Sequence, residues 1–330
     1  MSRIGVLGAG TWGTALAIML AQNANGVTLW SALDDELKTL EATHTHPNLK
    51  GSVIPDNIVF TNDISKVCSD KDILLFAVAS PYVRETAKKA APYIKEGQII
   101  VDAAKGLEED TLFTMSQVIK DGIGKNVTVV ALSGPTHAEE VALGLPTTVV
   151  AACRNLNAAQ QVQSIFMNTC MRVYTNEDIL GVELCGALKN IIALACGIST
   201  GLGFGDNAKA AIITRGIAEM SRLGMAMNCD KMTFAGLAGL GDLIVTATSC
   251  HSRNNRAGFL IGSGDSAEEA IKKVGMVVEG IHAIPSALKL AEKYKVDMPI
   301  ITAVHKTVSG ELNPDKAVSL LMNREKKSEQ

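Results

Sequence analysis

The chain has 330 residues, with 31 Lys and Arg against 34 Asp and Glu, which gives a formal net charge of −3 at pH 7. Hydrophobic residues make up 47% of the chain, which is too many for a disordered protein. The length predicts roughly two domains, each able to bury a core. Because the chain is slightly acidic, we expect no nucleic-acid partner and no attraction to an anionic membrane.

Short apolar runs alternate with amphipathic segments in the first half of the chain. The runs are nearly continuous, as in parallel strands that are covered on both faces. In chain order, the pattern predicts strands at residues 3–7, 27–30, 73–78, 98–102, 127–132, 147–152 and 172–174, with helices at 14–22, 81–93 and 110–120. We interpret segment 63–72 as a solvated turn. The alternation predicts the α/β class, with a Rossmann-like doubly wound sheet.

From about residue 178 onward the pattern becomes helical. Apolar residues recur at helical spacing, and convincing strand patterns disappear. Helices are predicted at 179–198, 207–223, 267–274, 281–292, 300–308 and 314–321. We therefore predict a Rossmann-like domain at 1–178 and an all-α domain at 179–330.

The cysteines and histidines argue against metal sites and disulfides. The seven Cys are odd in number and show no Cys-x-x-Cys spacing, so we expect buried free thiols in a reducing compartment. The six His form no His-Glu-x-x-His motif, and no metal is expected. The N-terminus is typical of a first strand rather than a signal peptide, and the longest apolar stretch, Ile191–Ile198, is too short for a membrane span. We expect a cytoplasmic protein without membrane insertion.

A glycine fingerprint follows the first predicted strand. Gly8, Gly10 and Gly13 form Gly-x-Gly-x-x-Gly between a strand and a helix. In dinucleotide-binding sheets these glycines permit the tight turn, the approach of the pyrophosphate and the packing of helix on strand. The free N–H groups of the helix then bind the anion. A tight packing turn without a ligand is the alternative interpretation.

The end of the second strand leaves the choice of cofactor open. An NAD site usually carries Asp or Glu there, to bind the ribose 2′-hydroxyl. This chain has none until Asp34 and Asp35, which come a few residues late. An NADP site would favour Arg, and none is present.

Polar residues follow two further predicted strands. Lys105 comes directly after strand 98–102, and Ser133-Gly134-Pro135-Thr136 ends strand 127–132. Ligands bind beyond the carboxyl ends of strands in such sheets, so these residues are candidates for a site. A solvated loop lysine is the alternative for Lys105.

Lys189 and Asn190 lie inside an otherwise apolar helix. Burial disfavours the ammonium, so we expect the pKa of Lys189 to fall toward neutrality, which suits a general acid/base for an alcohol and ketone pair. A lysine that extends its ammonium to water is the alternative. Asp242 stands in a glycine-rich apolar segment and could either orient a lysine or cap a helix. Ser252-Arg253-Asn254 could either bind a phosphate or begin a capped helix.

Seven motifs spread along the chain occur together in one known family. They are Gly8–Ala17, Ala104–Leu107, Ser133–Ala138, Gly186–Asn190, Gly239–Leu243, Ser252–Asn254 and Val278–Gly280. With these motifs, the chain resembles the bacterial NAD(P)-dependent glycerol-3-phosphate dehydrogenases over nearly its whole length.

The resemblance implies roles for individual residues. Cofactor contacts would come from Gly8, Gly10, Thr11, Trp12, Gly13, Lys105, Ala138, Arg253, Val277 and Glu279, the last two closing over the nicotinamide side. Substrate contacts would come from Lys105, Gly134, Thr136, Lys189, Asp242, Ser252, Arg253 and Asn254, with Lys189 as the catalytic proton acceptor. Ala32 stands where many relatives have a basic residue or His, so either NAD or NADP remains possible as the cofactor.

The resemblance implies a metal-independent, reversible hydride transfer. NAD(P)H would reduce dihydroxyacetone phosphate to sn-glycerol 3-phosphate for glycerophospholipid biosynthesis, in a chain that forms a homodimer by family analogy. Two alternatives remain: a dehydrogenase of the 3-hydroxyacid or 6-phosphogluconate type, and a dinucleotide sensor without catalytic activity.

Overall fold

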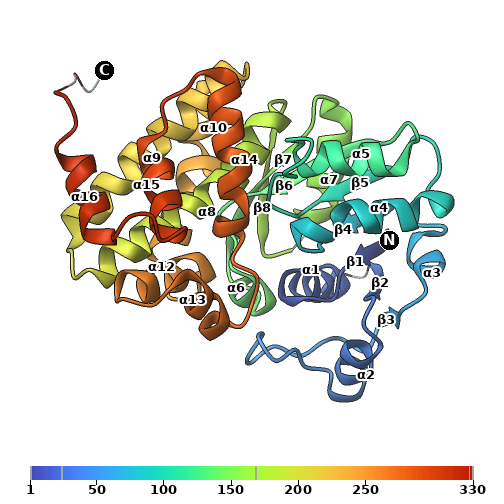
Figure 1. Cartoon of the computed structure of the whole chain (residues 1–330). Helices are drawn as coiled ribbons and strands as arrows, with labels where there is room; N and C mark the ends of the chain where they lie inside the picture. Colours follow the sequence, from blue (N-terminus) through green and yellow to red (C-terminus); the bar gives the residue numbers. More distant parts are fainter. Residues whose placement is uncertain (1, 24, 168, 327, 329–330) are drawn as a thin grey trace. The chain divides into compact units, whose positions relative to one another are not determined.

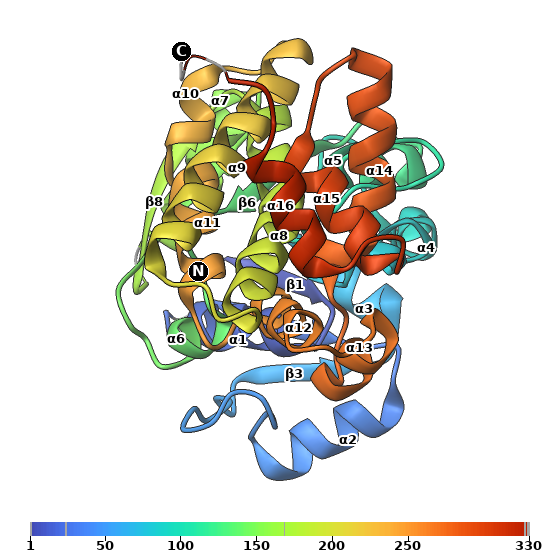
Figure 2. The same cartoon turned by 60° about the vertical axis from the view of Figure 1, so that its left-hand side comes forward.

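The computed structural model describes residues 2–23, 25–167, 169–326 and 328. The chain divides into two compact units, residues 1–183 and 184–330. Helix α8 (Ile179–Gly201) begins in the first unit and continues into the second, as can be followed along the ribbon in Figures 1 and 2. The α/β class with an all-α C-terminal part is confirmed.

In the described part of the first unit, eight strands form one sheet in the order β3-β2-β1-β4-β5-β6-β7-β8. Neighbouring strands are parallel apart from the antiparallel pair β6 and β7. The first six strands have the order of a dinucleotide-binding sheet. In such a sheet the strands remain parallel, but their order along the sheet reverses between β1 and β4. Their bounds are β1 (Arg3–Leu7), β2 (Gly26–Trp30), β3 (Ile58–Thr61), β4 (Ile73–Phe76), β5 (Ile99–Asp102), β6 (Thr128–Ser133), β7 (Thr147–Ala152) and β8 (Met171–Asn176).

Helices cover both faces of this sheet, and two cores result. Successive side chains of a strand point to opposite faces. In β4, Leu75 belongs to the core with α1, α2, α6 and α7, whereas Leu74 and Phe76 belong to the core with α3, α4 and α5. The bounds are α1 (Thr11–Gln22), α2 (Asp34–Thr43), α3 (Ile64–Cys68), α4 (Val83–Ala90), α5 (Met115–Ile123), α6 (Ala138–Ala142) and α7 (Leu156–Phe166).

The described residues of the second unit are helical and contain no strand. After α8 come α9 (Asp206–Ala226), α10 (Lys231–Ala235), a π-helical turn (Leu237–Gly241), α11 (Asp242–Thr248), α12 (Arg253–Gly262), α13 (Ala267–Val274), α14 (Glu279–Tyr294), α15 (Pro299–Val308) and α16 (Pro314–Met322). Helices α8 and α12 approach closely through glycines. A Cβ on Gly197 would lie 2.1 Å from the Asn255 carbonyl oxygen, and one on Gly258 would lie 2.1 Å from that of Leu194.

Several local expectations are wrong. Segment 63–72 is not a solvated turn, because it contains α3, which Asp63 caps by accepting the Ser65 N–H at 2.9 Å and which buries Val67 and Cys68. The helix expected at 110–120 begins only at Met115, since the Gln117 side chain accepts the Thr114 N–H, as in a capping box. The sequence pattern does not predict strand β3 or helices α2, α6, α7, α10 and α11, and it gives the start of α12 only as an alternative.

The thiols and the apolar helix α8 also differ from expectation. Five cysteines are buried, and burial raises the pKa of Cys68 and of Cys196 to about 12, but Cys170 is half-buried and Cys250 is exposed.

Helix α8 is long and apolar enough to cross a membrane, with a mean hydropathy of 1.8 in its most apolar window. That window is 89% buried, which is typical of a core helix.

Glu219 replaces the missing cap of α15. This side chain of α9 is 2% exposed, and its carboxylate accepts the N–H of Ile300 at 2.8 Å and that of Ile301 at 3.4 Å. Met298 at the N-cap position offers no side-chain hydrogen bond. Burial raises the pKa of Glu219 from 4.5 to about 7, against the opposing effect of the two backbone hydrogen bonds.

Because the pKa of Glu219 is raised by folding from 4.5 to about 7, its protonated form favours the folded state. The stabilisation is complete below pH 4.5 and is lost as the pH rises through 7. We expect Glu219→Gln to remove about 3 kcal/mol of pH dependence from the free energy of unfolding over this range. Urea unfolding at several pH values measures it, with the exposed Glu292→Gln as the control, and a pH dependence equal to that of the wild type would contradict the assignment.

Candidate functional site

The glycine turn between β1 and α1 has the shape that a dinucleotide site needs. Gly8 has a φ of 118°, and a Cβ on Gly13 would lie 1.9 Å from the Gly8 carbonyl oxygen. A Cβ on Gly10 would meet none of the described atoms within 4 Å. The first N–H groups of a helix have no partner within it and are suited to an anion. The turn therefore fits the pyrophosphate of NAD or NADP.

Three further predicted cofactor residues of the first unit lie on α1 or in the helix that contacts it. The Thr11 hydroxyl accepts a hydrogen bond from Asn48 Nδ2 at 3.1 Å, and half-buried Trp12 packs on the core that α1 shares. Ala138 begins α6 and packs on the same core. Figure 1 shows α6 beside α1, with which it is in contact. The structure thus gathers Thr11, Trp12 and Ala138 around one helix.

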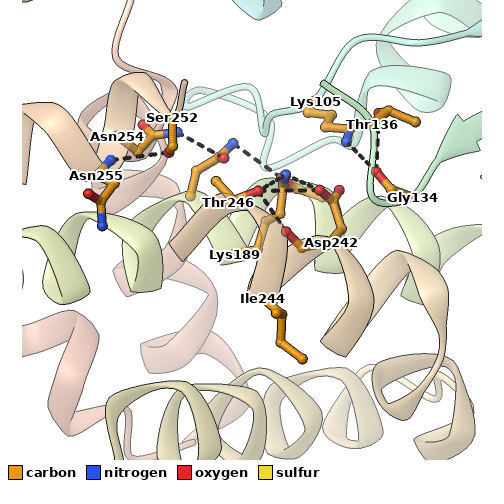
Figure 3. Close-up of polar contacts among 12 residues, drawn as sticks. Lys105, Gly134, Thr136, Lys189, Asp242, Ile244, Thr246, Ser252, Asn254 and Asn255 are labelled. Atoms are coloured by element: carbon orange, nitrogen blue, oxygen red, sulfur yellow. Dashed lines mark hydrogen bonds and ion pairs between the residues drawn. The ribbon is translucent and has the colours of Figure 1, made fainter. Parts of the chain in front are cut away.

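The ends of β5 and β6 bring three predicted substrate residues together. These strands are parallel neighbours, so their carboxyl ends meet at one edge of the sheet. Lys105 Nζ donates to the Gly134 carbonyl oxygen at 3.4 Å, and the Thr136 hydroxyl donates to the same oxygen at 3.1 Å (Figure 3). A Cβ on Gly134 would lie 3.0 Å from the Thr148 carbonyl oxygen, which leaves little room for a side chain. A cation and a hydroxyl here can bind a phosphate or another polar group.

A buried pair of carboxyl groups adjoins the strand end that carries Lys105. Asp102, the last residue of β5, is buried and accepts the Ala104 N–H at 3.0 Å. Glu183, near the start of α8, accepts the Thr114 hydroxyl at 2.8 Å and both the N–H and the hydroxyl of Ser116 at 2.7 Å. The sequence analysis assigned no role to either carboxyl.

Burial shifts the pKa values of these two carboxyl groups upward. Burial, together with the neighbouring Glu183 carboxylate, raises the pKa of Asp102 well above its usual range. Burial also raises the pKa of Glu183, but its hydrogen bonds from Ser116 and Thr114 favour the ionised form. These directions favour a proton on Asp102 and an ionised Glu183. Glu183 thereby fastens the first turns of α8 to Thr114 and Ser116 at the start of α5.

The second unit buries an ion pair between Lys189 and Asp242. The two side chains are 6% and 1% exposed. Lys189 Nζ also donates to the Thr246 hydroxyl at 2.7 Å, and that hydroxyl donates to the Asp242 carbonyl oxygen at 2.6 Å (Figure 3). Burial disfavours the ammonium, whereas the carboxylate favours it. The alternative of a lysine extended to water is wrong, since the ammonium lies inside the helical unit.

The glycine-rich segment before α11 positions Asp242. Leu237–Gly241 forms a π-helical turn, a feature that is frequent at functional sites. A Cβ on Gly239 would lie 2.1 Å from the Phe234 carbonyl oxygen, so the turn packs tightly on α10. Asp242 begins α11, and Thr246 follows one helical turn later on the same face. This spacing is the only sequence feature that could have identified Thr246.

The start of α12 is fastened to α8 and α14. The Ser252 hydroxyl accepts the Asn255 N–H at 3.2 Å and caps the helix. Asn254 donates to Asn190 Oδ1 at 2.9 Å and accepts the Gly280 N–H at 2.8 Å. Ser252 and Asn254 are shown in Figure 3. The capped helix start and the predicted binding motif are thus the same structure, and half-buried Arg253 is the first residue of the helix.

Val277 and Glu279 lie just before Gly280, whose N–H donates to Asn254. Val277 is half-buried, and Glu279 begins α14 directly before Gly280. The second unit therefore holds Lys189, Asp242, Ser252, Arg253, Asn254, Val277 and Glu279, while the first holds the remaining predicted residues.

Two further observations bear on what the chain could bind. A cavity of about 430 Å³ in the first unit is lined by Ser116, Lys120, Arg154, Glu183 and their neighbours, and it includes none of the predicted site residues. Among the described residues, no group of three or more His, Cys, Asp or Glu is placed to hold a metal ion.

Comparisons with known proteins agree on one family. Residues 3–159 match the family described as NAD-dependent glycerol-3-phosphate dehydrogenase N-terminus, and residues 178–319 match the corresponding C-terminus. The chain is 60% identical to glycerol-3-phosphate dehydrogenase (NAD(P)+) 2 of Lactobacillus delbrueckii subsp. bulgaricus, over 100% of this chain and 99% of that protein. It is 52% identical to glycerol-3-phosphate dehydrogenase (NAD(P)+) of Agathobacter rectalis, over 100% and 98%.

Solved structures agree with the sequence comparisons. The crystal structure of glycerol-3-phosphate dehydrogenase from Coxiella burnetii superposes with a TM-score of 0.93 at 36% identity, covering 98% of this chain and 99% of that one. A ketopantoate reductase from Ralstonia eutropha, at 16% identity and a TM-score of 0.62, shares the fold alone.

The proton between Asp102 and Glu183 can be located by paired amide substitutions. Asp102→Asn keeps an N–H donor toward Glu183, whereas Glu183→Gln turns an amide N–H toward the donors Thr114 and Ser116. We expect Asp102→Asn to change the free energy of unfolding by less than about 1 kcal/mol, and Glu183→Gln to lower it by about 2 kcal/mol. Urea unfolding at pH 7 measures both. A greater loss in Asp102→Asn would place the proton on Glu183 instead.

Proposed function

The chain belongs to the NAD-dependent glycerol-3-phosphate dehydrogenase family, and we propose that it interconverts dihydroxyacetone phosphate and sn-glycerol 3-phosphate with NAD(P)H. It is an oxidoreductase that acts on the CH–OH group of its substrate. We assign it the reductive direction, which supplies the glycerol phosphate of glycerophospholipids. The observation that carries the proposal is the buried Lys189–Asp242 ion pair, which places an amine where water cannot compete for its proton.

We assign the two halves of the chain different tasks. Residues 1–178 bind the dinucleotide, chiefly through the turn of Gly8, Gly10 and Gly13, and residues 179–330 hold the catalytic amine. The open space at Gly10 and the N-terminus of α1 support the first assignment. Thr11, Trp12, Lys105, Ala138, Arg253, Val277 and Glu279 complete the proposed cofactor contacts.

Lys189 is the proposed proton donor and acceptor. In the reduction, its ammonium donates a proton to the C2 oxygen of dihydroxyacetone phosphate, and in the oxidation the neutral amine takes the proton of the C2 hydroxyl. Asp242 and Thr246 both accept hydrogen bonds from the ammonium, which fixes the position of its nitrogen. The nicotinamide, when bound, supplies or accepts the hydride.

Phosphate recognition is assigned to charged and hydroxyl side chains. Arg253 offers a planar guanidinium that binds a phosphate through two parallel hydrogen bonds, at a helix N-terminus that favours anions. Lys105, Gly134 and Thr136 contact the substrate from the first unit, and Ser252 and Asn254 from the second. Asn254 is already held by Asn190 and Gly280, so its position is set before substrate binds. Fixing the phosphate fixes C2, which lowers the entropic cost of the reaction.

We further propose that the enzyme works in the cytoplasm as a homodimer, outside the membrane. The high burial of α8 supports a position in a protein core rather than in lipid.

Removing the amine of Lys189 tests the proposal. We expect Lys189→Ala to lower kcat for dihydroxyacetone phosphate by about 10³-fold, while NADH binding is retained, because general acid catalysis is lost. The absorbance of NADH and of NADPH during turnover measures the rate, and quenching of protein fluorescence measures cofactor binding. The matched control is Lys273→Ala, which removes an exposed lysine paired with Asp265 at 2.7 Å and should leave turnover unchanged.

Lys189→Ala leaves Asp242 buried without its partner, which costs about 3–5 kcal/mol of stability. The double variant Lys189→Met, Asp242→Asn removes both charges and keeps the test valid if the single variant unfolds. Unchanged turnover in either folded variant would exclude Lys189 as the proton donor. Wild-type turnover of 6-phosphogluconate or a 3-hydroxyacid, but not of dihydroxyacetone phosphate, would favour the alternative dehydrogenases, and cofactor binding without any turnover would favour a sensor.

A further inference from the structure

An acidic side chain lies at the end of β2, although the residues that directly follow the strand are not acidic. The buried Ser31 follows β2, and α2 begins three residues later at Asp34. The first turn of α2 brings Glu36 back toward the strand, so that Glu36 Oε2 accepts the Ser31 hydroxyl at 2.5 Å. A carboxylate therefore stands beyond the carboxyl end of β2. In dinucleotide-binding sheets this is the place of the acid that binds the ribose 2′-hydroxyl.

The hydrogen-bond donors near this carboxylate are already engaged with protein acceptors. The Ser31 hydroxyl donates to Glu36 and accepts the Leu33 N–H at 3.1 Å. Asn62 Nδ2 donates to Asp34 at 2.7 Å, and Trp30 Nε1 donates to the Asn62 carbonyl oxygen at 2.9 Å. A 2′-phosphate accepts hydrogen bonds but cannot donate to a carboxylate unless it is protonated, so it would have to break these contacts. A 2′-hydroxyl can donate to Glu36 and leave them intact.

The charges at this edge of the sheet also disfavour a phosphate. The first turn of α2 carries Asp34 besides Glu36, whereas the charge of Asp35 in the same turn is fully exposed and screened by solvent. The basic residue of α2, Lys38, is exposed and lies 3.6 Å from Asp35. His46 interacts with Glu36, but burial lowers the pKa of its imidazole and so favours the neutral form at neutral pH, against the effect of Glu36. A 2′-phosphate would therefore meet negative charge without compensation from this imidazole.

From these contacts we propose that Glu36 makes the chain select NAD(H) over NADP(H). The carboxylate accepts a hydrogen bond from the 2′-hydroxyl of NAD(H) and repels the 2′-phosphate of NADP(H). Glu36 comes even later in the chain than Asp34 and Asp35, but its carboxylate is the one that returns to Ser31 at the end of β2. The inference rests on the proposed function only in that the dinucleotide site is the one used for turnover.

The test compares the two cofactors in the wild type and in Glu36→Gln. With dihydroxyacetone phosphate saturating, we expect the wild type to show a kcat/KM for NADH at least about tenfold above that for NADPH. Glu36→Gln keeps an oxygen that can accept the Ser31 hydroxyl and removes only the charge. It should raise kcat/KM for NADPH by about tenfold and lower kcat/KM for NADH, because the neutral amide accepts the 2′-hydroxyl more weakly than the carboxylate does.

Asp35→Asn is the matched control, because Asp35 carries the same charge in the same helical turn but is 100% exposed. It should leave the NADH to NADPH ratio within about twofold of the wild type. The inference would be overturned by a wild-type preference for NADPH. It would also be overturned if Glu36→Gln left the NADH to NADPH ratio unchanged, or if Asp35→Asn changed that ratio equally. If the wild type oxidises neither cofactor with dihydroxyacetone phosphate, the proposed function fails. The inference is then tested separately by the dissociation constants of NADH and NADPH for the wild type, Glu36→Gln and Asp35→Asn.

Discussion

The buried ion pair of Lys189 and Asp242 is the constraint on which the helical unit depends. Taking two charges out of water costs several kcal/mol per ion, so such a pair persists only where its geometry and further hydrogen bonds compensate. Thr246 accepts from the ammonium and donates to the backbone of Asp242. The π-helical turn before α11 and the tight packing at Gly239 hold the carboxylate in place. The helices that carry the pair are thus fixed at the atoms where we propose that the proton moves.

The sheet brings residues from distant parts of the chain together at one edge, where their charged groups need not be buried. Parallel strands end at one edge, and there Lys105 and Gly134 come within hydrogen-bonding distance. Glu183, near the start of α8, accepts hydrogen bonds from Thr114 and Ser116 at the start of α5. Because α8 also carries Lys189, these hydrogen bonds fix the beginning of the helix that holds the proposed catalytic amine.

Local patterns predicted what depends on neighbours in the chain. The apolar runs identified most strands, and the glycine spacing and the isolated Lys189 indicated the two positions to which we assign cofactor binding and proton transfer. Patterns could not show which groups meet across the chain: Thr246 pairs with Lys189 from 57 positions away, and Glu183 meets Ser116 from 67 positions away. Glu36 was missed for the opposite reason, because only the turn from β2 into α2 brings its carboxylate back to Ser31.

Chemical rescue tests the central claim, that the amine of Lys189 carries the proton, most directly. Methylammonium added to Lys189→Ala can occupy the space of the missing side-chain end and pair with Asp242. The account predicts that NADH oxidation by dihydroxyacetone phosphate returns in proportion to the methylammonium concentration, whereas tetramethylammonium, which has no N–H, restores nothing. A variant that binds NADH and dihydroxyacetone phosphate as the wild type does, yet gains no activity from methylammonium, would contradict the account.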